Sequence, residues 1–128
     1  MQEITAEFLR GFIGNNDIPL VATQTKLCIP IIFRMCRKMS HGIRFDDIRV
    51  CDNLIIEGHH RYLSALISDF ALGRVPTNST SSTTPIAWDL VEFDENDWDT
   101  PAKIAHLNKL DAEYNGLEID FVARLTLR

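Results

Sequence analysis

Three observations predict a small α/β fold of the α+β kind, with a mixed sheet flanked by helices. The length of 128 residues suits one hydrophobic core. The hydrophobic period changes from helical to extended near Ile43. The β-prone stretch 54–56 then leads through one glycine directly into a helical pattern. We therefore expect residues 1–128 to form a single domain.

The N-terminal part of the chain predicts a helix followed by a short strand. Residues 4–13 have apolar side chains at helical spacing, and Thr5 is suited to cap this helix. A polar turn at residues 14–17 separates it from residues 18–23, which favour a short strand.

A second helix is predicted over residues 29–41, with Pro30 in its first turn and Gly42 after its end. Five apolar side chains follow helical spacing along it, which predicts a buried stripe. The basic side chains lie off this stripe, which is typical of a solvated helix face. They are Arg34, Arg37 and Lys38.

The middle of the chain predicts a hairpin and a third helix. Residues 48–50 and 54–56 are β-prone, and the polar residues 51–53 suit the turn between them. The helix that follows is predicted to reach Leu72, with Gly73 as its C-terminal cap.

The remaining chain predicts a loop, a strand, a helix and a final strand. Residues 75–85 are rich in Ser and Thr and lack packing groups, so we expect a flexible loop. Residues 86–93 favour a strand, and 94–99 an acidic turn. A helix is predicted over residues 100–116, because Thr100 and Pro101 suit its start and Gly116 its end. The alternating pattern of 117–128 favours a strand.

The charge is unevenly distributed between the two parts of the chain. The net charge is −5, with +1 over residues 1–74 and −6 over residues 75–128. An acidic protein is poorly suited to non-specific binding of duplex nucleic acid, which depends on neutralising phosphates. A local site for a small anion in the first part remains compatible with this balance.

Neither a membrane segment nor a disulfide framework is predicted. The longest strongly apolar stretch, 29–33, is far shorter than the roughly 20 residues of a spanning helix. The N-terminal residues carry acids and no basic region of the signal-peptide type. Three cysteines without a CxxC spacing favour reduced thiols, so a cytoplasmic location is expected.

The sequence LIIEGHHRYLSA at residues 54–65 carries the strongest functional signal. It predicts a strand, a glycine turn at Gly58, and a helix that opens with His59, His60 and Arg61. Cationic groups at a helix N-terminus cost about 0.3–1 kcal/mol per full charge. An anion bound at the turn makes the same placement of charges favourable. Gly58 allows a close backbone approach, and Arg61 can clamp two oxygens. The pattern therefore predicts an anion site.

Each residue of this motif has a predicted role and an alternative. Glu57 is suited to act as a general base, and His60 to donate a proton or bind a phosphate oxygen. Ser64, one turn into the helix, is a further candidate ligand-binding residue. The alternative is that Glu57 forms an ion pair with Arg61 while the histidines cap or are solvated.

At this motif the chain resembles the ParB/sulfiredoxin-like fold family, in which the loop after a β-hairpin grips nucleotide phosphates. The likeness extends by element order over about residues 18–93, and its specific part is about ten residues long. Sulfiredoxins need a cysteine where His59 stands. Partition-type ParB proteins carry Gly-Glu-Arg-Arg and a helix-turn-helix domain, which this chain lacks. The motif is closer to the ParB-like and free-serine-kinase-like branches.

Metal binding is predicted at a different segment. His59 and His60 are adjacent and diverge by about 100° on a helix, so they do not suit one metal ion. The acidic run 92–99 can supply oxygen ligands for Mg²⁺ beside a nucleotide, with Asp94 and Asp97 as the foremost candidates. The alternative is a solvated acidic turn.

Together these observations predict binding of a nucleotide (ATP, ADP or CTP) or another phosphorylated small molecule. Phosphoryl transfer, or hydrolysis of a nucleotide or phosphodiester, is the expected chemistry if the protein is an enzyme. The main alternative is a non-enzymatic nucleotide-sensing or protein-binding module. A third is a ParB-like nuclease toxin domain, which the acidic composition disfavours. The loop 75–85 is either a lid over the phosphate site or a connector.

Overall fold

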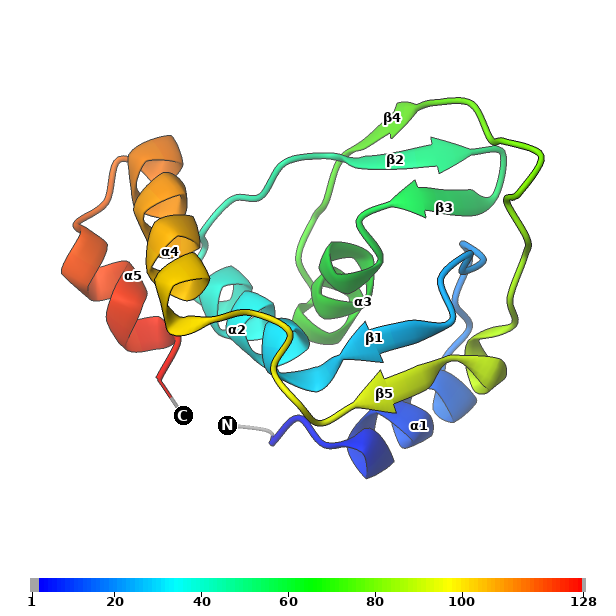
Figure 1. The fold of residues 1–128 in the computed structure, drawn as a ribbon, viewed down its shortest axis with the longest axis horizontal. Coiled ribbons are helices and arrows are strands. Elements are labelled where there is room, and N and C mark those ends of the chain that lie inside the picture. The colour runs from blue at the N-terminus through cyan, green and yellow to red at the C-terminus, as the bar shows by residue number, and fades with distance from the viewer. Residues whose placement is uncertain (1–2, 128) are drawn as a thin grey trace.

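The computed structural model, which describes residues 3–127, contains helices interspersed with short strands and ends in two consecutive helices (Figure 1). The helices are α1 (Ala6–Asn15), α2 (Ile29–Ser40), α3 (His59–Ser68), α4 (Pro101–Asn115) and α5 (Ile119–Leu125). The strands are β1 (Lys26–Cys28), β2 (Ile48–Cys51), β3 (Leu54–Glu57), β4 (Arg74–Pro76) and β5 (Glu92–Asp94). The predicted α+β fold in one small domain is confirmed.

The strands form a mixed three-stranded sheet and a separate parallel pair. In the sheet, β2 lies between β3, to which it is antiparallel, and β4, to which it is parallel. The pair consists of β1 and β5. Single β-bridges at Val21 and Ala22 link the segment before β1 to Leu54 and Ile86. The predicted strand over 18–23 is thus reduced to these two bridges.

The main core lies between α1, the sheet and the α2–α3 pair, and a smaller cluster joins α4 and α5 to the chain just after α2. Fully buried side chains of the main core include Leu9, Ile32, Ile48, Ile55 and Leu63. The smaller cluster comprises Ile43, Ala112, Val122 and Leu125. Over residues 3–127, no helix has the length and apolar character needed to cross a membrane.

Several helix ends follow the local sequence signals. Thr5 and Thr100 cap α1 and α4, because each side chain accepts a hydrogen bond from the amide three residues later. Gly116 ends α4 in the left-handed conformation. The predicted hairpin at β2 and β3 is confirmed, with Asp52 at φ +53° in its turn.

The end of α3 differs from the prediction. The helix stops at Ser68, and Asp69 adopts the left-handed conformation with φ +52°, although Leu72 and Gly73 were the expected end and cap. The amide of Phe70 then donates to the carbonyl of Ala65, which closes the helix terminus. Asp is one of the few non-glycine residues that tolerate this conformation, so its signal is weaker than that of glycine.

The C-terminal segment is a helix, and the strand predicted over 117–128 is wrong. Val122 and Leu125, three residues apart, face the core as α5, and Phe121 packs beside them. Asp120 in the first turn and Arg124 in the last turn complement the helix macrodipole. Packing against α4 selects the helical spacing over the alternating pattern, which the same residues also satisfy.

Two further segments also differ from the prediction. Residues 86–93 form a bridge, a 3₁₀ turn at Trp88–Leu90 and the short strand β5, instead of one strand. The loop predicted over 75–85 begins two residues later, because Val75 and Pro76 belong to β4. The indole of Trp88 donates to the carbonyl of Leu20, which holds the 3₁₀ turn against the core.

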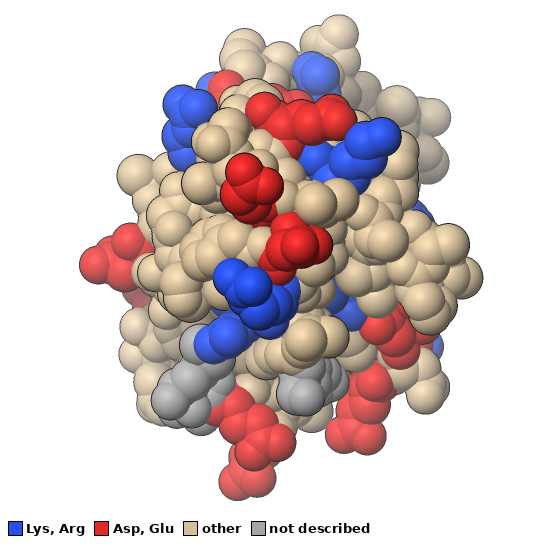
Figure 2. All heavy atoms as spheres, turned by 90° about the vertical axis from the view of Figure 1, so that its left-hand side faces the viewer, with Lys and Arg blue, Asp and Glu red and all other residues tan. Residues whose placement is uncertain are grey.

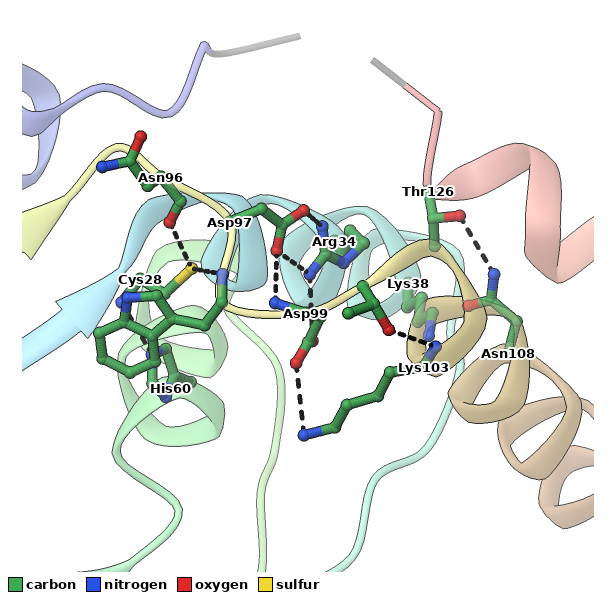
Figure 3. Close-up of polar contacts among 12 residues, drawn as sticks. Cys28, Arg34, Lys38, His60, Asn96, Asp97, Asp99, Lys103, Asn108 and Thr126 are labelled. Carbon is green, nitrogen blue, oxygen red and sulfur yellow. Dashed lines mark hydrogen bonds and ion pairs between the residues drawn. The ribbon is translucent and has the colours of Figure 1, made fainter.

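Two cations of α2 are buried, although the sequence placed them on a solvated face. The guanidinium of Arg34 contacts Asp97 at 2.6 Å and Asp99 at 3.1 Å, and Figure 3 shows it pointing toward both carboxylates. The ammonium of Lys38 contacts Asp111 of α4 at 2.6 Å. These ion pairs attach the acidic turn and α4 to α2. A periodicity analysis misses them because the partners lie more than 60 residues away.

We expect Arg34→Met to lower the free energy of unfolding by about 3–5 kcal/mol, because it removes the largely buried guanidinium that pairs with both Asp97 and Asp99. Arg49→Met is the matched control. Its pair with Glu57 is 53% and 63% exposed, so its loss is expected to cost at most about 1 kcal/mol. Urea unfolding of the two variants measures the difference. Equal losses would contradict the structural role of Arg34.

Candidate functional site

The turn between β3 and α3 requires a glycine. Gly58 has φ +102°, and a Cβ atom added there would lie 2.5 Å from Cγ2 of Ile48 and 2.9 Å from Nη2 of Arg61. The left-handed region and the close approach of Ile48 both exclude a side chain. Gly58 therefore places the start of α3 directly against the end of β3, as the sequence predicts.

His59 and His60 bind backbone amides of an earlier segment. Nε2 of His59 accepts a hydrogen bond from the amide of Thr23 at 2.9 Å, and Nε2 of His60 accepts one from Cys28, also at 2.9 Å. The side chain of His59 is buried, and the ring of His60 packs against the Trp98 indole in a T-shaped arrangement, with 5.4 Å between the centroids. Both rings thus fasten the start of α3 to residues 23–28.

Both imidazoles are neutral near pH 7. Burial lowers the pKa of His59 to about 4, and the pKa of His60 is lowered to about 4 mainly by burial. Because each Nε2 accepts a hydrogen bond from an amide, the ring proton must be on Nδ1. The sequence leaves His59 and His60 as potentially cationic, whereas in the structure both rings are neutral at this helix N-terminus. Arg61 provides the cation of the motif.

Arg61 is held loosely by its neighbours. Nη1 donates to the carbonyl of Asp46 at 3.3 Å, and Nη2 lies 4.0 Å from a carboxylate oxygen of Glu57. Glu57 is instead closer to Arg49, at 3.2 Å, and its side chain is 63% exposed. The alternative ion pair of Glu57 with Arg61 is thus present only at the limit of contact.

A comparison of two arginines shows what is unusual at Arg61. The side chains of Arg34 and Arg61 are 10% and 18% exposed, so both are largely withdrawn from water. Arg34 has two carboxylates within 3.1 Å, whereas the nearest carboxylate to Arg61 is at 4.0 Å. A guanidinium has five donors in a fixed fork. Arg61 therefore has donor capacity for an anion that its own carboxylate neighbours do not use.

The backbone at the start of α3 also favours binding of an anion. No side chain caps this helix, and no acidic residue lies in its first turn. By contrast, threonine hydroxyls cap α1 and α4. The amides of the first turn of α3 and the positive end of its dipole are therefore not neutralised by a cap or an acid.

Arg61 also lines an open groove of about 680 Å³. One wall is the loop at residues 44–46, and the other is the C-terminal half of α4. The remaining lining residues are Arg44, Phe45, Asp46, Leu110, Asp111, Glu113 and Tyr114. The guanidinium of Arg44 lies over the ring of Tyr114, at 5.6 Å from its centroid. The sequence did not predict this groove, because its walls are 60 or more residues apart in the chain.

Ser64 does not belong to this site. Its side chain is fully buried, and its hydroxyl is 3.5 Å from the carbonyl of Ile32 in α2. The ligand-binding role predicted from its position one turn into the helix is therefore not supported, because the hydroxyl faces the helix pair and not the glycine turn.

The predicted metal ligands are engaged separately. Both carboxylate oxygens of Asp97 accept hydrogen bonds from Arg34. Asp94 is half-buried, and hydrogen bonds from the indole of Trp98 and the amide of Asn96 lower the pKa of its carboxyl group. Among residues 3–127, no three His, Cys, Asp or Glu side chains are grouped so that they can hold a metal ion.

The Ser/Thr-rich loop leaves the sheet at the end remote from Gly58. The amide of Thr77 donates to the carbonyl of Val50, beside the hairpin turn, and Ile86 pairs with Ala22 near the same end. Gly58 follows the opposite end of β3, roughly 10 Å away for a four-residue strand. The arrangement in Figure 1 thus favours a connector over a lid.

The fold and site together define an α+β domain with a glycine turn that presents one loosely paired arginine. Comparisons with models of protein families, with curated proteins and with solved structures find no match. The resemblance to the ParB/sulfiredoxin-like family stays a prediction from the motif.

We expect the free energy of unfolding to fall as the pH decreases from about 6.5 to about 4. The folded-state pKa of each histidine lies below its ordinary value, so the unfolded chain binds more protons in this window. Each imidazole contributes at most about 1.4 kcal/mol per pH unit. Urea unfolding at pH 7 and pH 5 measures the fall.

The variant His60→Gln removes one titrating group, so its stability is expected to fall less between the two pH values. An unchanged pH dependence in His60→Gln would contradict a neutral, buried His60.

Proposed function

We propose that the turn at Gly58–Arg61 binds a phosphorylated small molecule, with a nucleotide such as ATP, ADP or CTP as the principal candidate. The observation that carries this proposal is the largely buried side chain of Arg61, whose guanidinium lies 4.0 Å from its nearest carboxylate. A phosphate group supplies the charge and the paired oxygens that match such a guanidinium. The uncapped amides of α3 add donors on the same turn.

The adjoining groove supports a ligand larger than inorganic phosphate. From Arg61 it extends to Leu110 and Tyr114, which offer an apolar and an aromatic surface. Arg44 over the Tyr114 ring provides a second cation. A nucleotide combines a phosphate with a flat base, so its two parts match the two ends of the groove.

The geometry favours binding over catalysis. Nε2 of His60 is already occupied by the amide of Cys28, and the ring is packed against Trp98. Because its pKa is lowered to about 4, the ring has no second proton to donate near pH 7, and it has no free nitrogen lone pair to accept one. Glu57 is exposed and lies 3.2 Å from Arg49, so it remains the candidate general base if turnover is found.

We expect Arg61→Ala to weaken binding of the tightest of phosphate, ADP, ATP and CTP by about 1.5–3 kcal/mol, because a charge-assisted bidentate contact is lost. Arg61→Lys retains the charge without the fork and is expected to give an intermediate affinity. Isothermal titration calorimetry measures the affinities.

Arg10→Ala on α1 is the matched control, because that guanidinium packs over Phe93 and is no part of the turn. It is expected to bind like the wild type. Equal affinity of Arg61→Ala and the wild type would remove the site assignment. A wild-type protein that binds none of the four ligands would refute the proposed function.

The loop over residues 77–84 is expected to exchange its amide protons rapidly both with and without the ligand. Its two ends lie by the hairpin turn, away from Gly58, so ordering of the phosphate site does not require it to close. Hydrogen–deuterium exchange measures this directly. Protection that appears in 77–84 when ligand is added would instead establish a lid.

A further inference from the structure

Exposed apolar side chains gather at the C-terminal helical hairpin. Leu90 and Trp98 lie elsewhere, and the other large apolar side chains that are at least 36% exposed belong to α4, α5 and the residues beside them. These are Leu107, Leu110, Tyr114, Leu117, Ile119 and Leu127. Single exposed apolar residues are ordinary, whereas a contiguous set of them marks an interaction surface.

Within this set, α4 carries a regular stripe. The helix buries Asn108 and Ala112 against the domain, so the opposite side faces outward. That side presents Lys103, Leu107, Leu110 and Tyr114, which we call the α4 seam. Their separations of four, three and four residues are those of a coiled-coil seam. At 3.6 residues per turn, the four side chains fall within about 60° of one another.

We propose that the α4 seam pairs with the same seam of a second copy of this chain, with the two α4 helices antiparallel about a twofold axis. In that arrangement Leu107 of one copy meets Leu110 of the other. Lys103 then meets Tyr114 of the other copy at both ends of the contact. In such an isologous interface, both copies contribute the same surface.

The charges along α4 favour the antiparallel direction. A parallel pair would bring Lys103 against Lys103, which is a repulsive contact. An antiparallel pair instead brings Lys103, which lies 3.4 Å from Asp99 in the single chain, to the ring of Tyr114. That ring is 58% exposed, and Arg44 covers only one of its two faces. His106 and Glu113 flank the same side of the seam, seven residues apart, and each meets the other across the antiparallel contact.

The surface around the seam fits a second copy better than a strongly charged partner. Figure 2 shows acidic and basic side chains interspersed over the face that includes α4 and α5, without a large area of one sign. A nucleic acid would require a basic area, and a strongly basic peptide an acidic one. A face with charges of both signs can place acidic groups of one copy against basic groups of the other. The inference rests on exposure, spacing and charge order, and not on the proposed anion binding.

Sedimentation velocity over a range of protein concentrations tests the proposal. The wild type is expected to approach twice the single-chain mass of 14.6 kDa as concentration rises. Leu110→Asp, 45% exposed in the single chain, is expected to stay at the single-chain mass. At concentrations where the wild type is also a single chain, it is expected to keep the wild-type melting temperature. Leu90→Asp is the matched control, 69% exposed but outside α4, and is expected to associate like the wild type.

Cysteine cross-linking in a Cys51→Ser background tests the direction of the helices. A mixture of Lys103→Cys and Tyr114→Cys chains is expected to give disulfide-linked pairs that contain one chain of each kind. Cross-linking of Lys103→Cys alone would overturn the antiparallel direction. A wild type that remains a single chain at all concentrations, or a Leu110→Asp variant that still associates, would overturn the proposal.

Discussion

The two hydrogen bonds from backbone amides to the imidazoles of His59 and His60 determine how the rest of the motif is arranged. They fasten the first turn of α3 to Thr23 and Cys28, on either side of the start of β1. Because the rings are neutral acceptors, they contribute no charge to the helix N-terminus. The electrostatic character of the turn therefore depends on Arg61 and on the uncapped amides of α3. A motif that suggests three cations in the sequence thus contains one.

The uneven charge of the chain has a structural explanation in the contacts of α2. Asp97, Asp99 and Asp111 come from the acidic C-terminal part, and they pair with Arg34 and Lys38 from the first part. These ion pairs thus join the acidic turn and α4 to α2 (Figure 3). Asp97 consequently lies in an ion-pair network, which explains why the acidic turn does not present its carboxylates together as a metal site.

The groove beside Arg61 and the α4 seam share one helix. Leu110 and Tyr114 contribute to both, because they lie where the outward side of α4 meets the loop at residues 44–46. The buried residues of α4 are Asn108 and Ala112, and its polar contacts with the rest of the domain include Lys38 with Asp111 and Arg44 with Asn115. The remaining apolar side chains of the helix are thereby left for surfaces outside the single-chain core.

The sequence by itself determined the elements whose signals are local. The caps at Thr5 and Thr100, the hairpin before Gly58 and the start of α3 all depend on residues within a few positions of one another, and the structure agrees with them. Tertiary structure decided the rest. The α5 segment satisfies both a helical and an alternating pattern, and only its packing on α4 selects between them. The neutral histidines, the buried α2 cations and the groove depend on partners roughly 30 to 70 residues away in the chain, and no local pattern encodes such a contact.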